Sequence, residues 1–383
     1  MQKNIFLFSI ILFFSCLGEK EKTIHKGLDF KEVEKLGFDL QEGFIQGDIK
    51  AINSLYDKYS LANKFLLKTS KKRVLEFNKG FYYSFAREFN FGKILIEEKK
   101  NEASYEFVKF YKDKSSNYHL LFRFFSADGI NYHDHLLKKV KGTPKIVDTY
   151  IFMSGENLSD TYKTIYKSAL YGSNFLTKDI SNSRFVKDLD KLKKIRLLNS
   201  KGKFKKSHKV YQSISSTSKQ EKIYKLTNIN ITSNISLELY EEALDDYDEK
   251  YPNDPSLQLM AIDRYLIKKE YDKSLLAIDK LDSLVKGDTF LNYLRGNVSF
   301  QKKDFNSALS NYKYIIKEYP DFFDVYESLF SLYVNTNDSN NALNILDIYV
   351  SKFDISKEEI KSNYKDIFPS FINTTKFKNW CKI

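Results

Sequence analysis

The first regular pattern of the chain begins near residue 30, where apolar side chains recur at the interval of an amphipathic helix. The stripe consists of Phe30, Val33, Leu36, Leu40 and Phe44. The Gly-Asp pair at 47–48 interrupts it, and apolar residues at helical spacing resume directly afterwards. A second long helix is predicted over about 74–96. The N-terminal part of the chain therefore starts with helices.

Four runs rich in aromatic and β-branched residues follow, at 104–111, 118–125, 132–140 and 145–153. Short polar turns separate them, which is typical of an antiparallel meander. Asn157 or Ser159 can cap a last helix. We therefore expect an α+β domain over 30–172, with helices and a curled, four-stranded antiparallel sheet. This order of elements resembles the cystatin-like and NTF2-like folds.

Beyond residue 172 the strand pattern disappears, and similar stretches of sequence recur at a longer, regular interval. Ser274, Ala308 and Ala342 stand at equal intervals, each in similar local sequence. The interval is that of tetratricopeptide (TPR) repeats, and the copy from about residue 289 resembles their consensus at Gly296, Ala308, Tyr312 and Pro320. The resemblance implies an all-α solenoid of about five helical hairpins within 183–366. The tail, 367–383, holds the sole Trp and either packs back on the last repeat or binds a partner.

A TPR solenoid implies a concave groove lined by the first helix of each hairpin, and such faces bind peptides or protein surfaces. The positions that the consensus places in the groove include Asp263, Phe290, Tyr293, Asn297, Phe300 and Glu327. This mixture of aromatic and acidic residues differs from the lysine-rich groove of chaperone-tail binders. We therefore expect a protein-binding scaffold and no catalysis.

The first residues predict export. An apolar run over 5–14 follows a lysine and is too short to span a bilayer, as in a secretory signal. The sequence FFSC then resembles the lipobox of bacterial lipoproteins, with Phe where leucine is usual. The resemblance implies a signal peptide over 1–15, lipid attachment at Cys16 and a tether over 16–29. The alternative is an ordinary cleaved signal.

The formal net charge is +12, which in a cytosolic protein would suggest nucleic acid. For an exported, lipid-anchored protein we expect no nucleic acid, and the lysines suit anionic head groups, glycans or acidic proteins. The basic stretch 187–209 could contact the same anionic head groups, glycans or acidic proteins, or it could be a solvated helix face. We expect a place in the bacterial cell envelope, on the periplasmic or surface face of the outer membrane. The expected partner is an envelope protein or peptide, with no cofactor.

The stretch NYHDHLL contains His133, Asp134 and His135 in a chain with five histidines. In a strand the two histidines share one face and the aspartate points to the other. Zinc would need a third ligand, for which His119 on the neighbouring strand is the nearest candidate. A metal-dependent enzyme using these histidines is our third hypothesis. We prefer a plain strand and expect no metal site.

The second hypothesis is a lipoprotein that binds a small molecule or glycan in a pocket of the N-terminal sheet. The side chains that could line this pocket are Arg123, Tyr132 and Asp134. Phosphate-binding glycine loops, nucleophile elbows, zincin motifs and CxxC pairs are absent from the sequence. No recognised catalytic motif therefore competes with the scaffold hypothesis.

Overall fold

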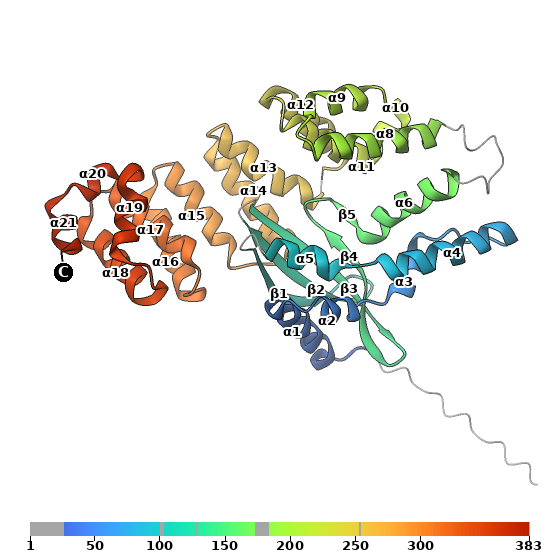
Figure 1. The fold of residues 1–383 in the computed structure, drawn as a ribbon, viewed down its shortest axis with the longest axis horizontal. Helices are drawn as coiled ribbons and strands as arrows, with labels where there is room; N and C mark the ends of the chain where they lie inside the picture. The colour runs from blue at the N-terminus through green and yellow to red at the C-terminus, as the bar shows by residue number, and fades with distance from the viewer. Residues whose placement is uncertain (1–26, 100–102, 127–128, 173–183, 253, 383) are drawn as a thin grey trace, which may run out of the picture.

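The computed structural model describes residues 27–99, 103–126, 129–172, 184–252 and 254–382. An N-terminal part with helices and an antiparallel sheet is followed by a helical part that runs from α8 to α21 (Figure 1). The predicted order, α+β and then all-α, is confirmed. The predicted signal peptide, Cys16 and most of the tether lie outside the described residues.

The helices of the N-terminal part are α1 (Phe30–Gln46), α2 (Ile49–Ser54), α3 (Lys58–Phe65), α4 (Lys72–Glu88), α5 (Phe91–Lys99) and α6 (Leu158–Gly172). Helix α1 starts at a capping box, in which Asp29 and Glu32 each accept the other's backbone N–H. It ends at Gly47, whose φ of 71° is left-handed. The apolar stripe predicted from residue 33 onward is buried.

The single helix predicted over about 74–96 is wrong, because the segment forms two helices, α4 and α5. Asn90 lies at the break, where its Oδ1 accepts the backbone N–H of Lys93 and the side-chain amide of Asn53. A Cβ on Gly92 would lie 2.8 Å from the carbonyl oxygen of Ile49 in α2. The tight contact between α5 and α2 therefore sets the break.

The sheet has five strands, not four: β1 (Ser104–Lys112), β2 (Tyr118–Ser126), β3 (Gly129–Val140), β4 (Thr143–Ile151) and β5 (Glu156–Asn157). They lie in the order β1-β2-β3-β4-β5, and all pairs are antiparallel. The four predicted runs correspond to β1–β4. The additional strand β5 has two residues, which is too short to give an alternating pattern.

The two faces of the sheet belong to different cores. Leu120 and Phe122 of β2 pack with the buried stripe of α1, whereas Leu121 packs with the helical part of the chain. Ile130 and Tyr132 of β3 also belong to this second core. Successive side chains of a strand point to opposite faces, so the sheet is covered on one face by its own helices and on the other by the helical array.

The helices of the array are α8 (Arg184–Asn199), α9 (Phe204–Gln212), α10 (Ser216–Lys219), α11 (Lys222–Thr232), α12 (Leu237–Lys250), α13 (Pro255–Ile267), α14 (Tyr271–Leu284), α15 (Leu291–Gln301), α16 (Phe305–Glu318), α17 (Phe323–Asn335), α18 (Ser339–Phe353), α19 (Lys357–Ile367), α20 (Pro369–Ile372) and α21 (Thr375–Cys381). Neighbouring helices pack as hairpins, for example α13 with α14, α15 with α16 and α17 with α18. Each of these three hairpins turns through one residue in the left-handed region, Lys269, Lys303 and Asn337, with φ of 60°, 67° and 58°. The turns repeat at the same interval as the sequence pattern.

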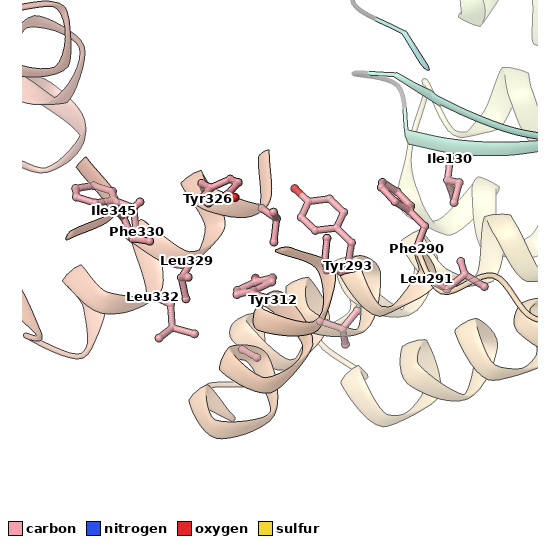
Figure 2. Packing of buried hydrophobic residues seen from close by; sticks show 14 of the residues in the cluster. Ile130, Phe290, Leu291, Tyr293, Tyr312, Tyr326, Leu329, Phe330, Leu332 and Ile345 are labelled. Carbon is pink, nitrogen blue, oxygen red and sulfur yellow. The ribbon is translucent and has the colours of Figure 1, made fainter. Parts of the chain in front are cut away.

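Buried side chains connect the sheet to the far end of the array. Figure 2 shows a row that starts at Ile130 of β3 and continues through Phe290 and Tyr312 to Phe330 and Ile345. The tail folds back on α18, where Nε1 of Trp380 donates to Asp347 at 2.7 Å. Of the two predictions for the tail, the structure has the intramolecular packing. None of the helices in the described ranges is both long and apolar enough to cross a bilayer.

Gly296 provides a test of the hairpin packing. A Cβ at this position of α15 would lie 2.5 Å from the ring of Tyr312 in α16. We expect Gly296→Ala to lower the free energy of unfolding by about 1–2 kcal/mol, since overpacking outweighs the gain in helix propensity. Gly80 of α4 has nothing within 4 Å of such a Cβ, so Gly80→Ala should raise it by about 0.5–1 kcal/mol. Urea titration of both variants measures the two effects, and equal shifts would contradict the close approach.

Candidate functional site

A groove lies on one side of the array, where the first helices of successive hairpins meet. Its cavity measures about 530 Å³. The lining comes chiefly from α13, α15, α17 and α19, and consists of Leu266, Asn297, Phe300, Gln301, Tyr312, Glu327, Ser328, Ser331, Tyr364, Ile367 and Phe368. This volume falls within the roughly 300–1,000 Å³ typical of ligand pockets. We call this cavity the concave groove.

Three of the predicted groove residues, Asn297, Phe300 and Glu327, line the concave groove. Asp263 lies on α13 with an exposed side chain and is not part of the lining. Phe290 and Tyr293 are buried, with 3% and 8% of their surfaces exposed. Both rings contact Phe125 of β2. The consensus therefore placed these two aromatic residues on the partner's side, whereas the protein's own sheet covers them.

The carboxylate of Glu327 is the charged group of the groove. No hydrogen bond or ion pair joins it to any side chain in the described part of the chain. The side chain of Glu327 is exposed at the groove, but partial desolvation by the neighbouring protein raises its pKa, and the charge of Asp324 raises this pKa further. Its own charge in turn contributes to the raised pKa of Tyr364. The groove thus presents an anion among aromatic rings.

Amide and hydroxyl groups complete the polar lining. Oδ1 of Asn297 accepts a hydrogen bond of 2.9 Å from the hydroxyl of Tyr312, which leaves the amide N–H groups as donors. The hydroxyl of Ser328 donates to the carbonyl of Asp324. Gln301 has an exposed side chain at the rim. The groove can therefore hydrogen-bond a backbone or a polar side chain while its rim contacts apolar groups.

The predicted sheet pocket is occupied by the protein itself. Nη1 of Arg123 donates to both carboxylate oxygens of Asp288, at 2.7 and 2.9 Å, and the hydroxyl of Tyr132 donates to the same group at 2.8 Å. Asp288 precedes α15 and also accepts the backbone N–H of Phe290. The side chains of Arg123 and Asp288 are 3% and 1% exposed. We call this group the Arg123–Asp288 junction.

Aromatic rings enclose the junction. The guanidinium carbon of Arg123 lies 4.0 Å from the ring centre of Phe290 and 5.1 Å from that of Tyr319. Burial acts to lower the pKa of Arg123, but the charge of Asp288 outweighs it and the pKa is raised. The guanidinium is therefore held in its charged form between the sheet and the array. A small cavity of about 220 Å³ remains beside it.

The third predicted pocket residue, Asp134, lies apart from the junction. It accepts hydrogen bonds from the hydroxyl of Tyr111 at 2.5 Å and from Nδ1 of His119 at 2.8 Å. Burial acts to lower the pKa of His119, whereas the carboxylates of Asp134 and Asp113 raise it, and the net pKa is raised. Asp134 and His119 form a polar contact between β2 and β3.

His133 and His135 lie on the opposite face of β3, as the alternation predicted. His135 is fully buried, and its Nε2 and Nδ1 lie 2.7 Å from the hydroxyl of Tyr105 and 2.8 Å from that of Thr149. Burial lowers the pKa of His133 to about 3 and that of His135 well below its usual value. Both rings are neutral and hydrogen-bonded within the sheet core.

The three histidines therefore do not converge, since His119 points to the face opposite His133 and His135. Across the described ranges, no three histidine, cysteine, aspartate or glutamate side chains are placed to hold a metal ion. The ligand set of the third hypothesis is not formed in this structure.

Comparison with known proteins identifies no relative. No family model, no curated protein and no solved structure matches the chain. The function is therefore argued from the geometry of the concave groove and of the Arg123–Asp288 junction.

Sequence reasoning missed parts of both sites. Gln301 and Ser328 are neighbours in sequence of predicted groove residues, so a wider stripe along the same helices would have included them. Tyr364 and Phe368 come from the capping helix and the segment after it, which the consensus does not cover. Asp288 lies 165 positions from Arg123, and no local signal connects residues so far apart.

Substitution of Asp288 tests the junction. Asp288→Asn leaves the Arg123 charge buried without a counter-charge, so the free energy of unfolding should fall by about 3–5 kcal/mol. Asp272 pairs with Lys302 while remaining 81% exposed, and Asp272→Asn should cost less than about 1 kcal/mol. Chemical denaturation of both variants checks the difference. A loss at Asp288 no larger than at Asp272 would show that the junction does not hold the sheet on the array.

Proposed function

We propose that the protein is a membrane-anchored envelope lipoprotein that holds a protein partner in the concave groove of a TPR-type array. The observation that carries the proposal is the groove itself, which is formed by the first helices of successive hairpins and lined by Glu327 without a charge partner in the described part of the chain. Concave faces of stacked helical hairpins are suited to binding peptides or protein surfaces. The geometry supports binding better than chemistry.

Two features support the TPR assignment of the hairpins. Their left-handed turns recur at the regular interval that is characteristic of these repeats. A glycine of the first helix, Gly296, also meets an aromatic ring of the second, Tyr312, and both stand at the consensus positions. The sheet with its helices would then serve as a platform for the array, and its resemblance to the cystatin-like and NTF2-like folds stays a proposal.

The lining of the groove argues for a scaffold. It offers one carboxylate, amides, hydroxyls and apolar groups, with neither histidine nor cysteine among the lining residues. Histidine is the side chain most often used in general acid–base catalysis, and cysteine is a common nucleophile. A single carboxylate among aromatic and amide groups instead suits recognition of a partner.

The second hypothesis, a small-molecule or glycan site in the sheet, has less support. The space beside Arg123 is about 220 Å³, below the roughly 300 Å³ at which ligand pockets begin. Arg123 is bound to Asp288, and the ammonium of Lys109 donates to the carbonyl of Lys286. The cations that would attract an anionic ligand are already engaged within the protein.

Site-specific photocrosslinking tests the groove. A photoreactive amino acid in place of Gln301, at the rim, should give a defined crosslinked partner in intact bacterial cells, because its side chain faces the bound protein. The same replacement at Glu249, exposed on α12 and outside the lining, should give none. Ser331→Trp, which fills the groove, should abolish the Gln301 crosslink. Crosslinks that are equal at both positions and unaffected by Ser331→Trp would refute a partner in the groove.

Metabolic labelling tests the anchor. We expect radiolabelled palmitate to enter the protein through Cys16, and Cys16→Ala to abolish the label and release the protein from the membrane fraction, since two or more acyl chains are needed for stable anchoring. Cys381, the only other cysteine, provides the control, and Cys381→Ala should leave both label and fraction unchanged. Label that persists in Cys16→Ala, or protein that stays in the membrane fraction, would contradict the anchor.

A further inference from the structure

The concave groove has a charge distribution that selects one kind of partner. Its carboxylate, Glu327, belongs to an exposed side chain that lines the cavity and is bound to no cation in the described structure. The rings of Phe300, Tyr312 and Tyr364 line the same cavity. A carboxylate beside these rings attracts a cation more strongly than in open water, because the effective dielectric constant near a protein surface is lower than that of bulk water.

Aromatic rings add to this preference. Their faces attract ammonium and guanidinium groups, with an interaction that grows as the cation loses water. Lysine and arginine also carry long apolar stems that pack on rings while the charged end reaches a carboxylate. Leu266, Ile367 and Phe368 add apolar side chains to the lining of the same cavity, and we call these three residues the apolar rim.

We propose that the concave groove binds a segment of a partner protein in which a lysine or arginine stands next to an apolar residue. The cation contacts Glu327, and the apolar side chain contacts the rim. The amides of Asn297 and Gln301 then hydrogen-bond the backbone of the segment. This inference rests on the proposed function and names the chemistry of its partner.

The net charge of the chain limits how such a partner arrives. Because the protein as a whole carries +12, long-range electrostatics does not steer a basic segment toward it. The attraction is local, at the carboxylate of Glu327 in the lining of the groove. An acidic segment or an anionic head group would instead be repelled at the groove, although lysines elsewhere on the surface attract it.

A peptide assay tests the proposal on the full chain. The probe is a short fluorescent peptide that alternates lysine with leucine, beside the same peptide with norleucine or glutamate in place of each lysine. We expect the lysine peptide to bind about fivefold more tightly than the norleucine peptide, which is a difference of about 1 kcal/mol. The glutamate peptide should bind more weakly than both. Because these changes are made in the ligand, they leave the folding of the protein untouched.

Substitutions in the protein, combined with the change of peptide, form a double-mutant cycle. Glu327→Gln should lower the affinity for the lysine peptide about fivefold. It should leave the affinity for the norleucine peptide unchanged, since that peptide forms no ion pair with Glu327. Glu327→Asp keeps the charge and should retain the preference for lysine. Glu249→Gln, the same change outside the groove, should have no effect.

The outcomes separate this inference from the proposed function. If Ser331→Trp abolishes binding of all peptides but Glu327→Gln leaves the lysine preference intact, the groove binds a partner and the cationic chemistry is wrong. Preference for the glutamate peptide would also overturn it. If spermine binds in a Glu327-dependent manner while the lysine peptide does not bind, the groove takes a free amine and the peptide proposal fails.

Discussion

The Arg123–Asp288 junction places the two parts of the chain relative to each other. Removing both charges from water is costly, and the hydrogen bonds to Asp288 offset this cost. Nε of Arg123 is buried and makes no hydrogen bond in the described structure. Asp288 accepts from the guanidinium, from the hydroxyl of Tyr132 and from the backbone N–H of Phe290. Phe290 is the residue directly before α15. The junction therefore fixes the start of a groove helix on the face of the sheet.

The apolar core carries this placement along the array. The row of buried residues in Figure 2 starts at the sheet and reaches the last hairpins, and the tail closes its far end through Trp380 and Asp347. The helices that line the concave groove are thus supported from behind over their length. A supported groove loses little conformational freedom when a partner binds, and that loss is one of the main costs of association. Deleting the array would conversely expose Arg123 and Phe125 on the sheet.

Local patterns predicted the elements, and tertiary contacts decided the exceptions. Alternation located β1–β4 and assigned His133 and His135 to one face, because the period of a strand depends on its own backbone. The break at Asn90 depends on Asn53 at the end of α2, which lies 37 positions earlier, and no helical periodicity contains it. The consensus placed Phe290 in the groove because it describes an array without a sheet beside it.

The division of polar groups between the sheet and the array supports our proposal that the array binds the partner. In the sheet, the charged and titratable side chains that the sequence singled out have partners: Arg123 is bound to Asp288, Asp134 to His119, and His135 to two hydroxyls. Buried polar groups satisfied in this way specify a unique packing and leave little binding capacity for a ligand. Glu327 differs, because its exposed side chain lines the concave groove without a hydrogen bond or ion pair to another side chain in the described part of the protein. Under our proposal, a cationic partner supplies the interaction that Glu327 does not make within the described part of the protein.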